Sequence, residues 1–133
     1  MKSDEQLLAE LREAIAGLTF MSESDYPLAV VHWQKVQEIT PEYLRQVSEQ
    51  PAGAPVRTRS VDEFFRRAAS AAGWKSRQEL ETAQRYQSLV RVLKENLTEL
   101  TVYRVGEINI PVYVVGRSTT GSWVGVSTKV VET

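Results

Sequence analysis

The chain has 133 residues, no cysteine and nearly balanced charge, with 16 Lys and Arg against 17 Asp and Glu. This length predicts a single domain, residues 1–133, that buries about two-thirds of the surface of its unfolded chain. The absence of cysteine excludes disulfides, thiolate zinc sites and cysteine nucleophiles. Balanced charge provides no broad basic field, so neither nucleic acid nor a membrane is expected as a direct partner. A polar N-terminus and the absence of a long apolar run favour a cytoplasmic protein.

The first half of the chain predicts helix, loop, strand and helix in turn. Ser3 and Gln6 form a capping-box pattern, and apolar residues at helical spacing then predict a helix over residues 4–16. Residues 18–27 have apolar anchors, a small acidic centre and a terminal Tyr-Pro, so we expect a pinned loop with an exposed acidic tip. Partial alternation predicts a strand over residues 28–35, and Thr40-Pro41 predicts a short helix over residues 42–49.

The second half predicts two more helices and most of a sheet. Residues 56–59 fit a short strand, and capping boxes that begin at Ser60 and Ser76 predict a helix around Phe64 and a long helix that ends near Asn96. Three β-branched runs, residues 101–105, 108–115 and 123–131, then predict a three-strand meander. We therefore expect an α+β fold, in which an antiparallel sheet of this meander and an N-terminal strand is covered by helices. The expected core positions are Leu11, Phe64, Val90, Leu93 and Tyr113.

The last predicted strand runs to the end of the sequence without a polar tail. Most termini fray, whereas a terminal strand held in a sheet has a fixed end. We therefore expect the Thr133 hydroxyl and the final carboxylate to be available as ligands.

Motifs for catalysis are absent. The sequence has one histidine, no glycine-rich phosphate loop, no nucleophile elbow and no HExxH pattern. His32 lies in a predicted strand, where it fits a hydrogen-bonded structural side chain better than a general base. We expect no enzyme activity and no cofactor.

Four polar residues in the acidic loop are candidates for a binding site. Glu23 and Asp25 fit a metal pair or an acid/base pair, but Ser22, Ser24 and Asp25 also fit a turn in which they bond to backbone amides while Glu23 is solvated. Trp74, which follows Gly73, fits either a lid on the core or a binding anchor.

Three stretches together resemble the nuclease A inhibitor family. These are residues 17–27 (GLTFMSESDYP), 101–116 (TVYRVGEINIPVYVVG) and 125–133 (GVSTKVVET). Residues 61–65 and the end of the long helix are similar more weakly, and residues 33–59 do not visibly follow the family. The resemblance implies an α-β-α sandwich and an inhibitor of a sugar-non-specific, Mg²⁺-dependent nuclease of the ββα-metal type.

The resemblance also implies roles for individual residues. Glu23 would lie where the charge of the scissile phosphate normally sits, and the Thr133 hydroxyl would ligate the Mg²⁺ of the nuclease. A second contact would be an acidic residue followed by tryptophan; here Trp74 matches, but Gly73 stands in the acidic position. Two alternatives remain at this point: a small metal- or ligand-binding enzyme that uses Glu23, Asp25, Glu107 and His32, and an adaptor that has lost its nuclease target.

Overall fold

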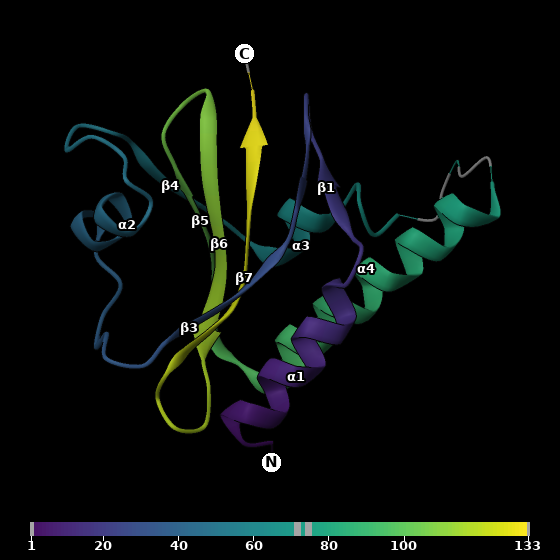
Figure 1. Cartoon of the computed structure of the whole chain (residues 1–133), viewed down its shortest axis with the longest axis horizontal. Coiled ribbons are helices and arrows are strands. Elements are labelled where there is room, and N and C mark those ends of the chain that lie inside the picture. The colour runs from purple at the N-terminus through teal and green to yellow at the C-terminus, as the bar shows by residue number, and fades with distance from the viewer. Residues whose placement is uncertain (1, 71–72, 74–75, 133) are drawn as a thin grey trace.

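A computed structural model describes residues 2–70, 73 and 76–132, which form an antiparallel sheet with helices on both faces (Figure 1). The strands of the main sheet lie in the order β3-β7-β6-β5-β4, and all four neighbouring pairs are antiparallel. Strands β1 and β2 form a separate hairpin. The elements in chain order are α1 (Asp4–Ile15), β1 (Thr19–Met21), β2 (Asp25–Pro27), β3 (Ala29–Trp33), α2 (Pro41–Val47), β4 (Val56–Arg59), α3 (Val61–Phe65), α4 (Arg77–Asn96), β5 (Thr98–Val105), β6 (Asn109–Arg117) and β7 (Trp123–Val131).

The helices form two layers around the sheet. Helices α1, α3 and α4 cover one face, and α2 covers the other (Figure 1). Alternation along the strands divides the side chains between these layers: Val112 and Val114 face the α1 and α4 layer, whereas Val115 and Tyr113 face the α2 side. The predicted α+β class is confirmed, and β4 extends the expected four-stranded sheet to five strands.

Side-chain caps begin the helices where the sequence predicts them. Ser3 and Gln6 form the full capping box of α1, in which each side chain bonds to the backbone of the other residue. The hydroxyls of Ser60 and Ser76 accept N–H bonds at 3.1 Å at the starts of α3 and α4. Helix α1 ends at Ile15, shortly before Gly17, which has a φ of +76° that favours glycine.

The segment predicted as a pinned loop is instead a short β-hairpin. Phe20 pairs with Tyr26 in the register of β1 and β2, and its buried ring stacks on Phe64 at a centroid distance of 4.5 Å. The Tyr86 hydroxyl donates a 2.6 Å hydrogen bond to the Thr19 carbonyl oxygen. These contacts to α3 and α4 hold the hairpin against the helical layer.

The predicted core is partly correct. Leu11 and Leu93 are fully buried, but Phe64, Val90 and Tyr113 are only partly buried. Within α3 the most buried ring belongs to the next residue, Phe65, because Phe64 covers Phe20 from the outside. A five-residue helix is too short for periodicity to separate its buried face from its exposed one.

Candidate functional site

The tip of the β1–β2 hairpin lies beside the end of β7, although the two segments are far apart in the sequence. The Ser22 hydroxyl accepts a 3.0 Å hydrogen bond from the Val131 N–H, a contact between residues 109 positions apart. The Glu23 N–H donates to the Val131 carbonyl oxygen at 3.3 Å. The backbone of the tip and that of β7 are therefore fixed relative to each other. We call this region, residues 22–25 and 131–132, the hairpin end of the sheet.

Local bonds shape the tip itself. Ser22 donates from both its N–H and its hydroxyl to the Ser24 carbonyl oxygen, at 3.2 and 3.0 Å. This pattern is typical of turns in which a serine side chain bonds to the backbone two residues on. Within the turn the Ser22 side chain therefore bonds to a carbonyl oxygen, and its backbone amide partner is the Val131 N–H of β7 rather than an amide of the turn. Glu23, Ser24 and Asp25 have exposed side chains, so the acidic tip is exposed as predicted.

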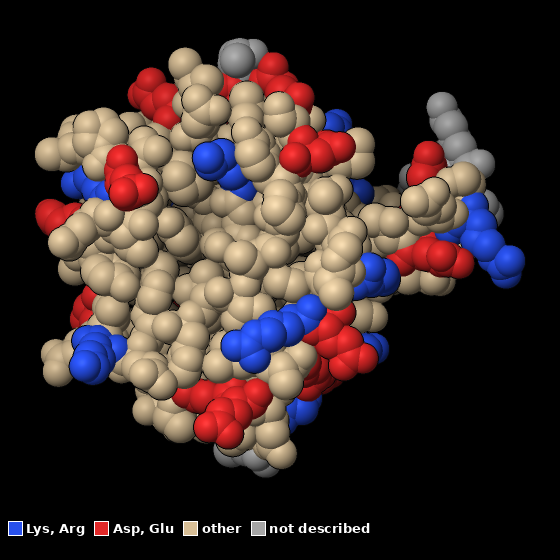
Figure 2. All heavy atoms as spheres, viewed as in Figure 1, with Lys and Arg blue, Asp and Glu red and all other residues tan. Residues whose placement is uncertain are grey.

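Acidic side chains gather at this end of the molecule. Glu23 and Asp25 belong to the tip, Glu132 follows β7, and Glu107 lies in the turn between β5 and β6; all four are exposed. The turn belongs to the same end because the Glu132 N–H donates to the Ile108 carbonyl oxygen at 3.0 Å. Figure 2 shows acidic side chains around the C-terminal end of the molecule, whereas an uncharged surface covers much of the centre of the same view.

A groove of about 1400 Å³ leads from the hairpin end toward the start of α4. Ser22, Glu23, Glu132 and Gly73 all line this groove. Gly73 is exposed and has a φ of +75°, which favours glycine over an acidic residue. Trp74 and Thr133, the other two residues that sequence analysis singled out, lie outside the described residues.

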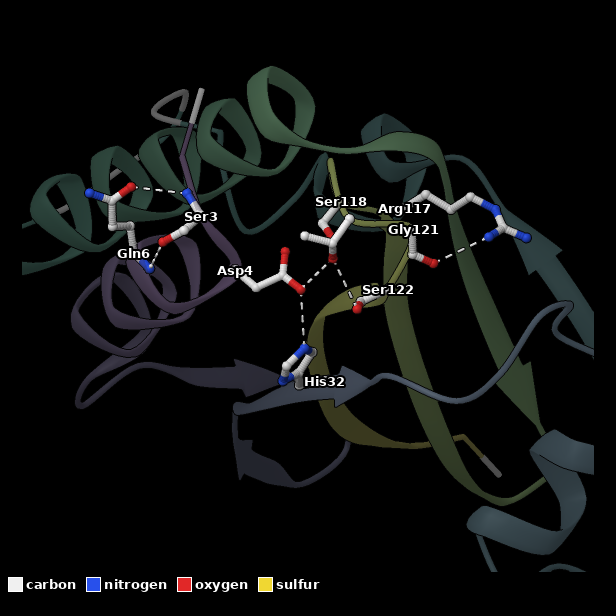
Figure 3. A network of polar contacts seen from close by, with 9 residues as sticks. Ser3, Asp4, Gln6, His32, Arg117, Ser118, Gly121 and Ser122 are labelled. Carbon is white, nitrogen blue, oxygen red and sulfur yellow. Dashed lines mark hydrogen bonds and ion pairs between the residues drawn. The ribbon is translucent and has the colours of Figure 1, made fainter.

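His32 lies at the opposite end of the sheet. It pairs with Val124 in β7, whereas Val131 is at the hairpin end of the same strand. Its Nε2 lies 3.3 Å from an Asp4 carboxylate oxygen, Oδ2, which also accepts a 2.7 Å hydrogen bond from the Thr120 hydroxyl (Figure 3). The structure therefore does not bring His32 together with Glu23, Asp25 and Glu107 in one cleft, as the enzyme alternative requires.

Burial and hydrogen bonding act in opposite directions on Asp4. Burial by itself raises the pKa of this carboxyl, but hydrogen bonds from Ser118, Thr120, Ser122 and His32 outweigh it and leave the pKa below its usual value of 3.8. The His32 ring and the Thr120 hydroxyl both contact Oδ2, whereas Oδ1 is buried without a hydrogen-bond partner among the described residues. This network joins α1, β3 and the loop between β6 and β7.

Two negative findings concern the part of the chain that the structure describes. Within residues 2–70, 73 and 76–132, no three His, Asp or Glu side chains come together in a way that could hold a metal ion. None of the helices found there has the length and apolar character that a membrane crossing requires.

A family model for nuclease A inhibitor-like proteins matches residues 5–133, nearly the whole chain. The chain belongs to this family. The match includes residues 33–59, where the sequence alone does not visibly follow the pattern of the family. No curated protein sequence matches the chain. Membership in the nuclease A inhibitor-like family supports an inhibitor-type function in general and a nuclease as partner in general, which agrees with the expectation of a protein that is not an enzyme.

Sequence reasoning missed one prominent residue of the site in this nuclease A inhibitor-like protein. Arg104 of β5 lines the groove and forms an ion pair with Glu132. Its position offered a signal, because strand alternation places it on the same face as buried Val102. A charged residue on the buried face of a strand indicates a partner, but sequence alone does not say which one.

Proposed function

We propose that this chain is a cytoplasmic protein inhibitor of a sugar-non-specific, Mg²⁺-dependent nuclease, and that all of residues 1–133 act as one inhibitor domain. In this proposal the hairpin end enters the active site of the nuclease and blocks it. The observation that carries the proposal is the bond between Ser22 and Val131, which joins an exposed acidic tip to the end of β7. Family membership supports the same reading.

Electrostatics favour Glu23 as the group that enters the nuclease. An active site that binds a polyanion is electropositive, so an exposed carboxylate on the inhibitor is attracted to it. The tip also needs little ordering on binding, because it is already held to β7: the Ser22 hydroxyl accepts from the Val131 N–H, and the Glu23 N–H donates to the Val131 carbonyl oxygen. Ser24 and Asp25 lie beside Glu23 in the tip and complete the proposed primary contact.

The Mg²⁺ of this proposal belongs to the nuclease. Mg²⁺ prefers hard oxygen ligands and commonly keeps several waters as well as substrate oxygens. The hairpin end offers such oxygens, from the Glu23 and Asp25 carboxylates and the Ser22 and Ser24 hydroxyls, but no group of three ligands among the described residues to hold an ion alone. We assign the bridging ligand to the Thr133 hydroxyl, one residue beyond Glu132.

The secondary contact of the proposal lies in the same groove. Gly73 and Glu23 line the same groove, so one partner surface laid over it reaches both. We assign Gly73 and Trp74 to this contact. Because glycine provides no charge, this side contributes through the backbone and the tryptophan rather than through an acidic group.

The decisive experiment mixes the purified chain with a sugar-non-specific ββα-metal nuclease in Mg²⁺ and measures DNA cleavage. We expect cleavage to stop as the inhibitor reaches a stoichiometric excess. Cleavage that continues unchanged at micromolar excess would reject the inhibitor assignment for that nuclease and favour an adaptor role. Titration of the isolated chain with Mg²⁺ or Mn²⁺ is the companion measurement, and tight binding without nuclease would contradict an ion held by the partner.

A second experiment tests the role of Thr133. Residues added after Thr133 would have to enter the metal pocket of the nuclease, so we expect a C-terminal tag to weaken inhibition. A tag of the same length before Met1 is the control, because the start of α1 lies at the other end of the sheet (Figure 1). Equal inhibition by both tagged proteins would count against Thr133 as a ligand.

A further inference from the structure

Four contacts hold the last described residues of the chain, and one of them is electrostatic. On one side of β7, the Val131 N–H donates to the Ser22 hydroxyl, and the Glu23 N–H donates to the Val131 carbonyl oxygen. On the other side, the Glu132 N–H donates to the Ile108 carbonyl oxygen in the turn before β6. The fourth contact is an ion pair between the side chains of Glu132 and Arg104. The first three fix the backbone of Val131 and Glu132, and the fourth fixes the side chain of the residue that follows β7.

Arg104 reaches Glu132 across an intervening strand. In the register of the sheet, Arg104 pairs with Val112 of β6, which in turn pairs with Thr128 of β7. The guanidinium therefore extends past β6 toward the end of β7, on the face that α1 and α4 cover.

The arginine is more enclosed than its partner. The side chain of Arg104 is 13% exposed, whereas that of Glu132 is 55% exposed. The Arg104 Nε is buried without a hydrogen-bond partner among the described residues. The side chain has therefore lost hydrogen bonds to water that its contacts with these residues do not fully replace. A charge buried in this way needs an opposite charge beside it, and Glu132 provides one.

We propose that Arg104 is a positioning residue, which acts through Glu132 to hold the end of β7 beside the acidic tip. This inference rests on the proposed function, in which the nuclease contacts both the tip and the end of β7. Without the ion pair, the backbone bond to Ile108 is the one contact that the described residues still provide to Glu132. Binding must then order it, and that cost lowers the affinity.

The first test needs no nuclease. Hydrogen exchange of the Val131 and Glu132 amides is compared between the wild-type protein and Arg104→Met. We expect exchange of these amides to be about tenfold faster in the variant. A change of this size corresponds to the free-energy cost of ordering roughly one side chain. The matched control is Arg57→Met, since Arg57 pairs with Arg104 in the register of β4 and β5 but has an exposed side chain. Unchanged exchange in Arg104→Met would overturn the proposal.

The second test is a double-mutant cycle on inhibition of the nuclease. We expect Arg104→Met and Glu132→Gln each to raise the inhibition constant about tenfold, and the double variant to be no worse than either single one, because the two residues act as a unit. Effects that multiply in the double variant would contradict action through Glu132. Arg104→Lys should keep most of the inhibition, since an ammonium group also pairs with Glu132. This variant keeps the test valid if methionine at position 104 prevents folding.

The two proposals fail in different ways. If the wild-type protein does not inhibit but Arg104→Met speeds exchange at Val131 and Glu132, the inhibitor function fails for that nuclease and the positioning role stands. If the wild-type protein inhibits and neither exchange nor inhibition responds to Arg104→Met, the positioning role fails alone.

Discussion

The two ends of the central sheet both gather polar side chains from distant parts of the chain, but they arrange them in opposite ways. At the end that contains His32, the Asp4 carboxylate is only 14% exposed. It lies 3.3 Å from the His32 Nε2 and accepts a hydrogen bond from the Thr120 hydroxyl. At the hairpin end, bonds fix the backbone of the tip, while the Glu23 and Asp25 side chains are exposed. At the His32 end the polar side chains bond to one another within the fold, whereas at the hairpin end the carboxylates of the tip lie at the surface.

This difference separates structural from functional polar groups. Groups that satisfy one another inside the protein stabilise it, and removing one leaves the others unpaired. Exposed charges on fixed backbone contribute little to stability, but they bind a partner with little loss of freedom. Substitutions at the His32 end should therefore change stability, and those at the hairpin end should change inhibition.

The largest expected effect is on inhibition at the hairpin end. We predict that Glu23→Ala weakens nuclease inhibition by about 2–5 kcal/mol, the range for truncating one partner of a charge pair buried in an interface. The free energy of unfolding should stay nearly unchanged, because the residue is exposed in the free protein. Inhibition constants and urea unfolding measure the two effects. The control is Glu42→Ala, because Glu42 is an exposed acidic residue in the first turn of α2. An equal loss of inhibition in this variant would show that the effect is not specific to the hairpin end.

The corresponding experiment at the His32 end of the sheet changes Asp4. We predict that Asp4→Ala lowers the free energy of unfolding by about 1–3 kcal/mol, because His32 and the hydroxyl of Thr120 lose a shared acceptor. Inhibition by the folded protein should be unchanged. Glu5→Ala is the control, since Glu5 is also acidic and in the first turn of α1 but is exposed. A loss of inhibition in Asp4→Ala at temperatures where it is fully folded would contradict the comparison.

Features of the fold set by neighbouring residues could be predicted from the sequence. The bounds of β7 match the predicted residues 123–131, and the capping serines begin α1, α3 and α4, because strand alternation and caps are local patterns. The hairpin was predicted only as a loop, since its pairing depends on Phe20 packing against α3. Likewise β5 begins at Thr98, before the predicted residue 101, and its register with β6 shifts between Thr98 and Thr101.

In the candidate site, too, local features could be predicted from the sequence and contacts between distant segments could not. The exposed acidic tip could be read from residues 22–25 because small polar residues favour turns. The bond from Val131 to Ser22, the Arg104 ion pair and the Asp4 network join segments between 28 and 116 positions apart. Such contacts follow from strand order and register, which local patterns do not fix.

A smaller effect should separate two exposed apolar residues. Met21 is 74% exposed beside the acidic tip, and Val47 is 36% exposed on α2, on the other face of the sheet. We predict that Met21→Ala weakens inhibition by about 1 kcal/mol, because apolar contacts around a charged anchor exclude water from it. Val47→Ala should leave the inhibition constant unchanged. If both substitutions act alike, the contact surface extends beyond the hairpin end.

The smallest effect is the dependence of stability on pH at the His32 end. Because hydrogen bonds hold the folded-state pKa of Asp4 below 3.8, the unfolded chain binds the proton more readily in acid. The contribution of Asp4 to stability is therefore fully present at neutral pH and is lost as the pH falls through the lowered pKa. We predict that the difference in unfolding free energy between the wild-type protein and Asp4→Asn, measured in urea, is larger at pH 7 than at about pH 3. A difference that grows in acid would mean that burial, rather than the hydroxyls of the β6–β7 loop, governs this carboxylate.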